Sequence, residues 1–424
     1  MPFAQFPKLG AVPVYIAVVG VGSAAFMMYA VVSSVYRITE AGLNPLELIL
    51  VGTVLEISAF LFEIPTGVVA DVYSRRLSLI IGTFLIGAGF IVEGLFPIFG
   101  AILVAQVLWG IGSTFGSGAQ EAWIADEVGD RDAGRVFLRG SQAARIGGIV
   151  GMALGVALAS GYTDLPIPDL AVPMIAGGCV NILLGVFMVL AMPEEGFHPA
   201  PIQDRKPWTA MSQTFIAGVR FVRVRPALVA IVAVALFFGA SSEPMDRFWQ
   251  LHLLTITGFD LPALGPLEPV VWWGIISAAT MLLGIGAIEL VRRYVDIDNP
   301  QVAVRTLSAL NTFTIAGVVV FAVTGNFALA IAAYLVYQVV RGVGGPVKRA
   351  WINRQLESNV RATVFSMHAQ ADAFGQVAVG PAMGVVATVA TVRAALLAVA
   401  ALLVPPQAIY AFIARLGERP PDGR

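Results

Sequence analysis

The sequence predicts an all-α membrane protein, with twelve transmembrane helices in two pseudo-symmetric six-helix bundles and both termini in the cytoplasm. Three observations predict this class: the composition, the length of the apolar runs, and an internal repeat. Of 424 residues, 58% are hydrophobic and 12% are charged, whereas soluble domains are typically about half apolar and about a quarter charged. A water-soluble globule cannot bury so much apolar surface, so a lipid bilayer is the expected surrounding.

A transmembrane helix needs about 20 mostly apolar residues, and charged, Pro-rich and Gly-rich breaks separate twelve such runs. The first six are expected near 13–36, 46–70, 77–96, 98–125, 136–160 and 170–192. The other six are expected near 226–256, 268–291, 302–323, 327–348, 362–389 and 393–414. The polar stretch between the two sets predicts an N-terminal bundle (1–192), a cytoplasmic linker (193–225), and a C-terminal bundle with a short cytoplasmic tail (226–424).

The distribution of Lys and Arg predicts the orientation of the runs, because cytoplasmic loops carry an excess of both residues. With the N-terminus placed inside, the outer segments contain only Arg37 and Arg393. We therefore expect an integral, multi-pass protein of the cell (inner or plasma) membrane, surrounded by lipid. The net charge of −1 gives no reason to expect a nucleic-acid partner.

An internal repeat relates the two halves of the chain. The stretches "EAWIADE" and "RAWINRQ" each end an apolar run, and a shift of 228 positions brings Trp123 onto Trp351. The same shift brings Val136-Phe137 onto Val364-Phe365. Similarity at half-chain spacing indicates a duplicated six-helix unit. Transporters built from paired repeats bind substrate at the repeat interface and rock between inward-open and outward-open states.

The stretch after the second run, "FEIPTGVVADVYSRRLSLIIG", contains Gly67, Asp71, Arg75 and Arg76. In spacing and position it resembles the cytoplasmic signature of the major facilitator superfamily, Gly-x-x-x-Asp-x-x-x-Arg-Arg/Lys. With the twelve runs and the repeat, the resemblance covers nearly the whole chain. It implies a monomeric secondary transporter of small molecules that works by rocker-switch alternating access and needs no cofactor. Prokaryotic drug-efflux-type members look most similar.

The chain departs from the family pattern at several positions. Val72 and Ser74 replace a frequent basic residue and the turn Gly of the signature. In the fourth run, Gln106 stands where the family usually has an Arg that the resemblance links to proton coupling, which argues against standard proton antiport. The fifth run lacks the Gly-Pro of drug antiporters. It has glycines at four-residue spacing, a pattern that lets helices approach closely: Gly147, Gly151 and Gly155.

The signature is expected to act as a cytoplasmic latch. Asp71 would face the N-terminus of the eleventh helix, whose free N–H groups carry positive partial charge. Arg75 and Arg76 would engage acids at the end of the fourth run, Asp126 or Glu127. Such contacts would close the cytoplasmic side and break when the halves rock. The alternative for the two arginines is ordinary positive-inside topology.

Ionisable residues within the runs cost several kcal/mol unless they are paired or hydrated, so each is a functional candidate. Either Glu56 or Glu63 is a candidate to carry a proton, because leaving water costs a neutral carboxyl less than a carboxylate; the alternative is a hydrogen bond to nearby backbone. The full set of candidates is Glu56, Glu63, Glu121, Arg145, Glu243, Asp246, Arg247, Arg341, Arg349 and Asp372.

The repeat suggests one acid–base pair in each half, with the signs reversed. Glu121 would pair with Arg145, and Arg349 with Asp372, each between the fourth and fifth helices of its half. The reversal also makes Glu121 and Arg349 complementary, so an exchange of partners between the two arrangements could serve as a switch. The alternative is static pairing that only fixes helix packing.

A second cluster lies in the seventh run, in "SSEPMDRFWQ", where Pro244 favours a kink. Glu243, Asp246 and Arg247 lie within about a turn of it, and Arg341 of the tenth run is expected at similar depth. By analogy with the family, this cluster would line the central cavity. The alternative, mainly for Arg247, is an outer-gate salt bridge.

The leading functional hypothesis is proton-coupled efflux of amphipathic, drug-like small molecules, with protons as the coupling ion. The alternatives are uptake or lipid-like facilitation without proton antiport, and a non-transporting membrane receptor. An enzyme is not expected, because no nucleophile–base pair is evident. His198, His252 and His368 are too scattered in the sequence to predict a metal site.

Overall fold

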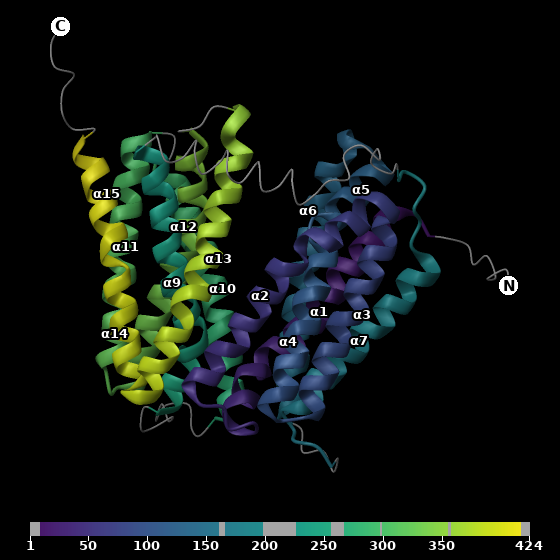
Figure 1. The fold of residues 1–424 in the computed structure, drawn as a ribbon, viewed down its shortest axis with the longest axis horizontal. Helices are drawn as coiled ribbons and strands as arrows, with labels where there is room; N and C mark the ends of the chain where they lie inside the picture. The colour runs from purple at the N-terminus through teal and green to yellow at the C-terminus, as the bar shows by residue number, and fades with distance from the viewer. Residues whose placement is uncertain are drawn as a thin grey trace, which may run out of the picture. The chain divides into compact units, whose positions relative to one another are not determined.

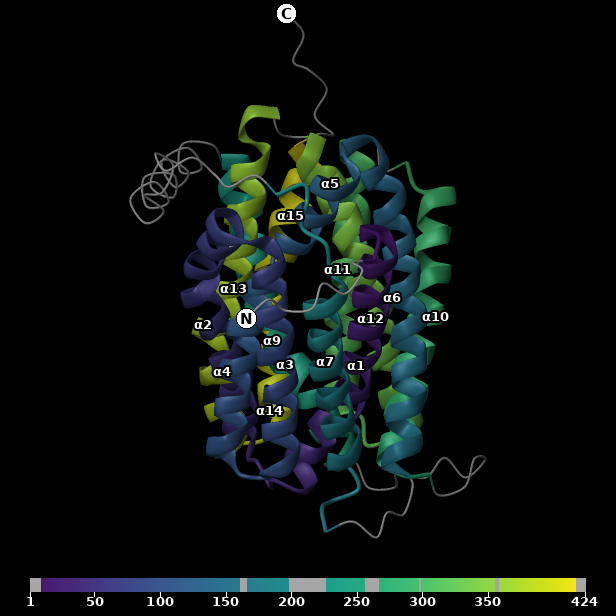
Figure 2. The ribbon, with the colours of Figure 1, turned by 90° about the vertical axis from the view of Figure 1, so that its right-hand side faces the viewer.

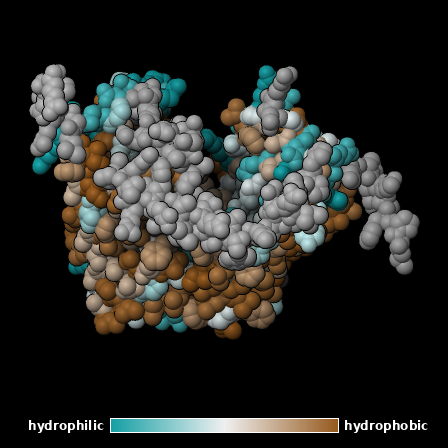
Figure 3. Space-filling view, turned by 45° about the horizontal axis from the view of Figure 1, so that its top comes forward, coloured by the Kyte–Doolittle hydropathy of each residue, from teal (hydrophilic) through white to brown (hydrophobic). Residues whose placement is uncertain are grey.

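The computed structural model describes residues 9–160, 166–197, 226–255, 267–296, 299–354 and 358–416, and this part of the chain is all-helical (Figures 1 and 2). It contains twelve helical segments that are long and apolar enough to cross a membrane. Each coincides with one of the predicted runs, so the predicted fold class is confirmed. Hydrophobic side chains cover most of the visible sides, and hydrophilic ones gather toward the end that is uppermost in Figure 1 (Figure 3).

The contacts divide the chain into two compact units, Met1–Leu43 with Val54–Met211, and Asn44–Thr53 with Ser212–Arg424. The helices up to residue 191 are α1 (Ala11–Thr39), α2 (Pro45–Val68), the π-helical η1 (Val69–Tyr73), α3 (Arg75–Leu95), α4 (Phe99–Gly116), α5 (Ala119–Val128), α6 (Asp130–Ala159) and α7 (Ala171–Ala191). Within the first unit, α1 packs against α6 and α7, and α3 packs against α4 and α7.

The remaining helices all belong to the second unit. They are α9 (Pro226–Thr255), α10 (Pro269–Tyr294), α11 (Pro300–Val323), α12 (Phe327–Arg354), α13 (Ser358–Val389), α14 (Val392–Leu402) and α15 (Val404–Leu416). In this unit α9 packs against α13 and α14, and α12 packs against α10 and α11. Residues Asn44–Thr53, which include the start of α2, also belong to this unit. There the backbone N–H of Leu46 donates a hydrogen bond to Oγ1 of Thr388 at 3.1 Å.

Helix α6 packs closely on α1 at the three glycines whose spacing predicted a close helix contact. A Cβ atom on Gly147 or on Gly151 would collide with the backbone carbonyl oxygen of Gly20 or of Ala24, respectively. On Gly155, it would lie 2.7 Å from Cγ1 of Val31. The absence of a side chain at these positions therefore lets the two backbones touch.

The Ala-Trp-Ile repeat is a repeat of packing. Trp123 and Ile124 are buried in a core cluster of the first unit, and Trp351 and Ile352 are buried in the corresponding cluster of the second. Nε1 of Trp123 donates to the carbonyl oxygen of Pro193 at 2.8 Å, whereas the Trp351 ring meets that of Tyr410 edge-on, with the ring centroids 6.4 Å apart. Burial of the same two side chains explains why the sequence keeps them in both halves.

Candidate functional site

The predicted latch region surrounds the start of α3 in the first unit. Ser74, where the family signature has a turn Gly, ends η1 and caps α3: its backbone is extended and its Oγ accepts the N–H of Leu77 at 2.9 Å. Nη1 of Arg75 forms a salt bridge with Asp126 and donates to the carbonyl oxygen of Ala122 at 2.8 Å. The predicted contact between the signature and the end of the fourth span is therefore present at Arg75.

Arg76 and Glu127 bind the end of α7 and the segment that follows it instead of each other. Nη2 of Arg76 donates to the carbonyl oxygen of Val189 at 2.5 Å, and its backbone N–H donates to Glu194 at 2.9 Å. Oε1 of Glu127 accepts the backbone N–H groups of Glu195 and Gly196. Sequence reasoning did not select Glu194, although the two acids in "MPEEGF" were a visible signal.

The other two latch residues make fewer contacts. Asp71 is exposed in η1 and takes part in no salt bridge among the described residues. Gly67 lies one turn before it, and a Cβ atom there would meet nothing within 4 Å. The expected engagement of Asp71 with the eleventh helix stays a prediction.

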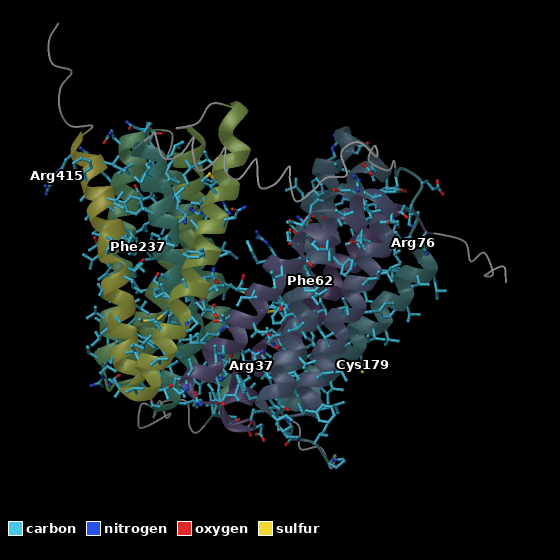
Figure 4. The ribbon with its side chains drawn as sticks, viewed as in Figure 1. Arg37, Phe62, Arg76, Cys179, Phe237 and Arg415 are labelled. Carbon is cyan, nitrogen blue, oxygen red and sulfur yellow. The ribbon has the colours of Figure 1, made fainter. Side chains whose placement is uncertain are left out.

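A buried polar network connects α1, α3 and α4 at the other end of the first unit; Figure 4 shows Arg37 and Arg76 toward opposite ends. Nε of Arg37 lies 2.7 Å from Oε1 of Glu93, and its Nη2 lies 3.1 Å from Oε2. Oε2 also accepts the hydroxyl of Tyr29 at 2.7 Å and Nε2 of Gln106 at 2.9 Å. All four side chains are buried, so this network (Tyr29, Arg37, Glu93 and Gln106) is closed to water.

This network corrects the expected end of the first helix and the expected place of Arg37. The predicted run ended at residue 36, but α1 continues to Thr39 and buries Arg37, which sequence reasoning had placed in an outer segment. Glu93 was missed altogether, although it is the acid within the predicted run 77–96. The chain thus has an arginine beside Gln106 after all, supplied by α1 rather than by α4.

The predicted pair of Glu121 and Arg145 is not formed. Both side chains are exposed, and neither has a salt bridge or side-chain hydrogen bond among the described residues. The prediction assumed one continuous helix, but α4 ends at Gly116, and Gly118 adopts φ +69° before α5 begins. Because of this break, the position of Glu121 does not follow from counting residues along a single helix. Of the other acids in this unit, Glu63 accepts the hydroxyl of Ser117 at 2.9 Å, and Glu56 is half-buried with a partner.

The second unit contains a cavity of about 440 Å³ that is lined by α9, α11, α12, α13, α15 and Leu403, the residue between α14 and α15. Its charged lining residues are Arg341, Lys348, Arg349 and Asp372. Arg341 binds Asp246 of α9 in a bidentate salt bridge, with N–O distances of 2.5 and 2.9 Å. The predicted meeting of Arg341 with the acids of the seventh span is therefore present at Asp246.

Glu243 and Arg247 form a separate salt bridge of 2.8 Å along α9, and Glu243 is buried. Neither these two residues nor Asp246 is among the described residues that line the cavity. Arg341 alone of this cluster lines the cavity of the second unit; the expectation that the cluster faces a central cavity between the two bundles stays a prediction.

The predicted pair of Arg349 and Asp372 is not formed either. Asp372 accepts a hydrogen bond from Gln376 at 3.0 Å, and the base whose charge reaches it from the cavity wall is Lys348. Sequence reasoning missed Lys348 because the predicted run ended there, whereas α12 extends to Arg354. The signal was helical periodicity: Arg341 and Lys348 are seven residues apart and share a face.

The described residues contain no group of three or more His, Cys, Asp or Glu side chains that could hold a metal ion. His252 is buried in α9 with Nε2 2.8 Å from the carbonyl oxygen of Phe321, and Nε2 of His368 is buried without a partner among these residues. His198 lies outside the described residues.

Comparison with solved structures supports the fold independently. The nucleoside transporter NupG superimposes with a TM-score of 0.73 and 13% identity, covering 97% of this chain and 100% of that chain. A bacterial homologue of the human lysosomal transporter Spinster gives 0.73 and 14%, with 97% and 98% covered. A POT family transporter in complex with 5-aminolevulinic acid gives 0.72 and 11%, with 96% of each chain covered. At these identities the likeness shows the fold alone.

Sequence comparison shows the family. The uncharacterized MFS-type transporter YxaM of Bacillus subtilis (strain 168) is 21% identical over 401 residues, 94% of this chain and 92% of that protein. The sequence profile described as Major Facilitator Superfamily matches residues 14–380. Because this match spans most of the chain, the protein belongs to the major facilitator superfamily and is an integral membrane secondary transporter, not an enzyme.

Proposed function

We propose that this transporter couples the movement of an amphipathic small molecule to that of a proton, with Asp372 as the proton-carrying residue. The observation that supports this is the position of Asp372. It lines the cavity of the second unit, accepts one hydrogen bond from Gln376, and takes part in no salt bridge among the described residues. An acid in a membrane span that lacks a dedicated partner is a candidate for reversible protonation.

The charged groups around Asp372 link its proton to an occupant of the cavity. Its charge interacts with Lys348, Arg341 and Asp246, but Arg341 and Asp246 already neutralise each other. Lys348 is thus the counter-charge that a bound molecule can draw away or shield. An acid that loses its counter-charge in a low-dielectric site takes up a proton, so substrate and proton binding are coupled through Lys348.

Proton-driven export of drug-like compounds is the second candidate function, favoured by the resemblance to efflux-type members. The observation that favours it is the same carboxylate, because Asp372 can hold either a proton or a cationic compound. In that case the proton and the compound compete and move in opposite directions. If the proton and the compound bind at the same time, they cross the membrane in the same direction. This case corresponds to the alternative of uptake without proton antiport.

The test uses purified protein in proteoliposomes with a pH-sensitive dye inside. We add matched amphipathic amines, alcohols and carboxylates, subtract the response of protein-free liposomes, and record the size and sign of the pH change. We expect a compound-dependent proton movement that is lost in Asp372→Asn and retained in Asp132→Asn, a matched change at an exposed acid of the first unit. Proton movement that persists in Asp372→Asn would overturn the assignment, and compound flux without any proton movement would overturn coupling.

A further inference from the structure

We infer that the substrate is an amphipathic organic anion, an apolar body that carries a carboxylate or a similar acid group. The inference rests on the proposed function and names the substrate class of the same cavity. Lys348 and Arg349 hold the acid group, and the apolar lining of the cavity holds the body.

The first argument is the charge balance of the cavity. Its lining contains three cationic side chains, Arg341, Lys348 and Arg349, against one acid, Asp372. The bidentate partner of Arg341 is Asp246, which compensates that guanidinium. Lys348 and Arg349 remain with Asp372 alone, which leaves one positive charge in excess. A bound anion would balance this excess charge.

The second argument is that the two cations have no salt-bridge partner among the described residues. Nζ of Lys348 lies over the ring of Phe238, 5.1 Å from its centroid. Nη2 of Arg349 folds back along α12 and lies 4.0 Å from where a Cβ atom of Gly345 would be. A guanidinium and an ammonium without a salt-bridge partner are strong donors to a carboxylate.

The third argument is the space in front of these cations. Gly344 and Gly345 of α12 both line the cavity and present no side chain to it. A Cβ atom on Gly344 would meet nothing within 4 Å. The cavity of about 440 Å³ falls within the range of roughly 300–1,000 Å³ usual for small-molecule sites.

The fourth argument is a set of polar atoms that lack partners on another wall of the cavity. The hydroxyl of Tyr410 and Oδ1 of Asn311 are buried and have no hydrogen-bond partner among the described residues. Both residues line the cavity and are only 1% and 2% exposed. Buried polar atoms without partners are rare in folded proteins, and a ligand with a polar group at its far end would satisfy them.

The apolar residues of the lining indicate what the rest of the ligand is. Phe238, Tyr337, Leu307, Leu310 and Leu403 contribute the apolar part of the lining. A ligand that fits this lining carries an acid group for the cations, an apolar body and a small polar group. A strongly hydrated inorganic anion would leave the apolar lining uncovered, so the body of the ligand is organic.

The test measures binding to the purified full-length protein by calorimetry, without any gradient. The probes are 4-phenylbutyrate, 4-phenylbutanol and 4-phenylbutylamine, and a second matched set with a naphthyl body. We expect the carboxylate of each set to bind at least about tenfold more tightly than its alcohol and its amine, as a charge-assisted contact requires. Equal or weaker binding of the carboxylates, including no binding by any probe, overturns the inference.

Four variants locate the site. Lys348→Gln and Arg349→Gln are expected to lower carboxylate affinity by about tenfold each, with alcohol binding unchanged. The matched control, Arg292→Gln, removes an exposed guanidinium on α10 and should change neither affinity. Lys348→Arg keeps the charge and should retain carboxylate binding, which separates loss of recognition from loss of folding. Unchanged carboxylate affinity in both Gln variants overturns the assignment.

The two proposals fail in different ways. Carboxylate-selective binding that depends on Lys348, without any proton movement in proteoliposomes, would refute proton coupling and leave the substrate class intact. Proton movement that depends on Asp372 but responds equally to amines would refute the substrate class and leave coupling intact.

Discussion

Arg37 and Glu93 form an ion pair inside the first unit, with 2.7 Å between Nε and Oε1 and with side chains that are 4% and 1% exposed. The pair joins α1 to α3, and Tyr29 and Gln106 donate to the second carboxylate oxygen. Both charges are therefore compensated, and both acid oxygens are hydrogen-bonded. Such a pair is strongly destabilised when one partner is lost, but much less so when both are replaced by apolar side chains.

The first prediction follows from this asymmetry. Glu93→Leu leaves the Arg37 guanidinium uncompensated, so we expect it to lower the free energy of unfolding by about 3–5 kcal/mol. The double variant Arg37→Met with Glu93→Leu should recover most of this loss, because no unpaired charge remains. Thermal unfolding of the purified protein in detergent checks both. If the double variant is no more stable than the single one, the pair is not the source of the loss.

The second prediction concerns the missing arginine of the fourth span. Gln106→Arg restores the family residue but puts a second guanidinium beside Arg37 on one carboxylate, so we expect lower thermal stability. Exchanging the two, as Arg37→Gln with Gln106→Arg, keeps one cation and one acid and should restore stability toward that of the natural protein. Equal stability of the single variant and the natural protein would contradict the view that Arg37 occupies the role of that arginine.

The sequence predicts the fold far better than it predicts this network. The twelve spans depend on the mean hydropathy of about 20 residues, which a few charges do not alter. The network depends on single residues at the ends of runs, where boundaries are uncertain by several residues. Arg37 was not predicted as a buried residue for this reason. The helix is three residues longer than expected, so a residue assigned to a loop is buried instead. Lys348 was lost in the same way at the end of the tenth run.

The charge pairs inferred from the repeat show a different limit. A shift of 228 positions aligns the sequence of the two halves, but depth and facing also depend on helix continuity. Gly118, with φ +69°, interrupts the fourth span before Glu121, and α12 has no such break before Arg349. What the two halves share is the burial of Trp123 and Trp351, which packing requires in both.

The third prediction concerns the latch salt bridge between Arg75 and Asp126. Both side chains are partly exposed, at 18% and 31%, so we expect Asp126→Asn to change stability by no more than about 1 kcal/mol. If the contact belongs to a gate, the transport rate should fall by much more than stability explains. The exchange Arg75→Asp with Asp126→Arg should restore the rate, whereas Asp132→Asn, in the exposed pair with Arg135, should leave it unchanged. Substrate flux in proteoliposomes and thermal unfolding of the same variants check this prediction. If Asp126→Asn transports as fast as the natural protein, Arg75 serves only to set the membrane topology.

The fourth prediction compares the two tryptophans of the repeat. Trp123 and Trp351 are both buried, so replacement by Phe leaves a similar void in each core and a similar cost in packing. Nε1 of Trp123 also donates to the carbonyl oxygen of Pro193 at 2.8 Å, whereas Nε1 of Trp351 has no partner among the described residues. Trp123→Phe strands a buried acceptor, which costs about 1–3 kcal/mol more, and Trp351→Phe removes a donor that was already unsatisfied. We therefore expect Trp123→Phe to be the more destabilising by that margin in denaturant unfolding of the purified protein; equal losses would show that the Pro193 contact contributes nothing beyond packing.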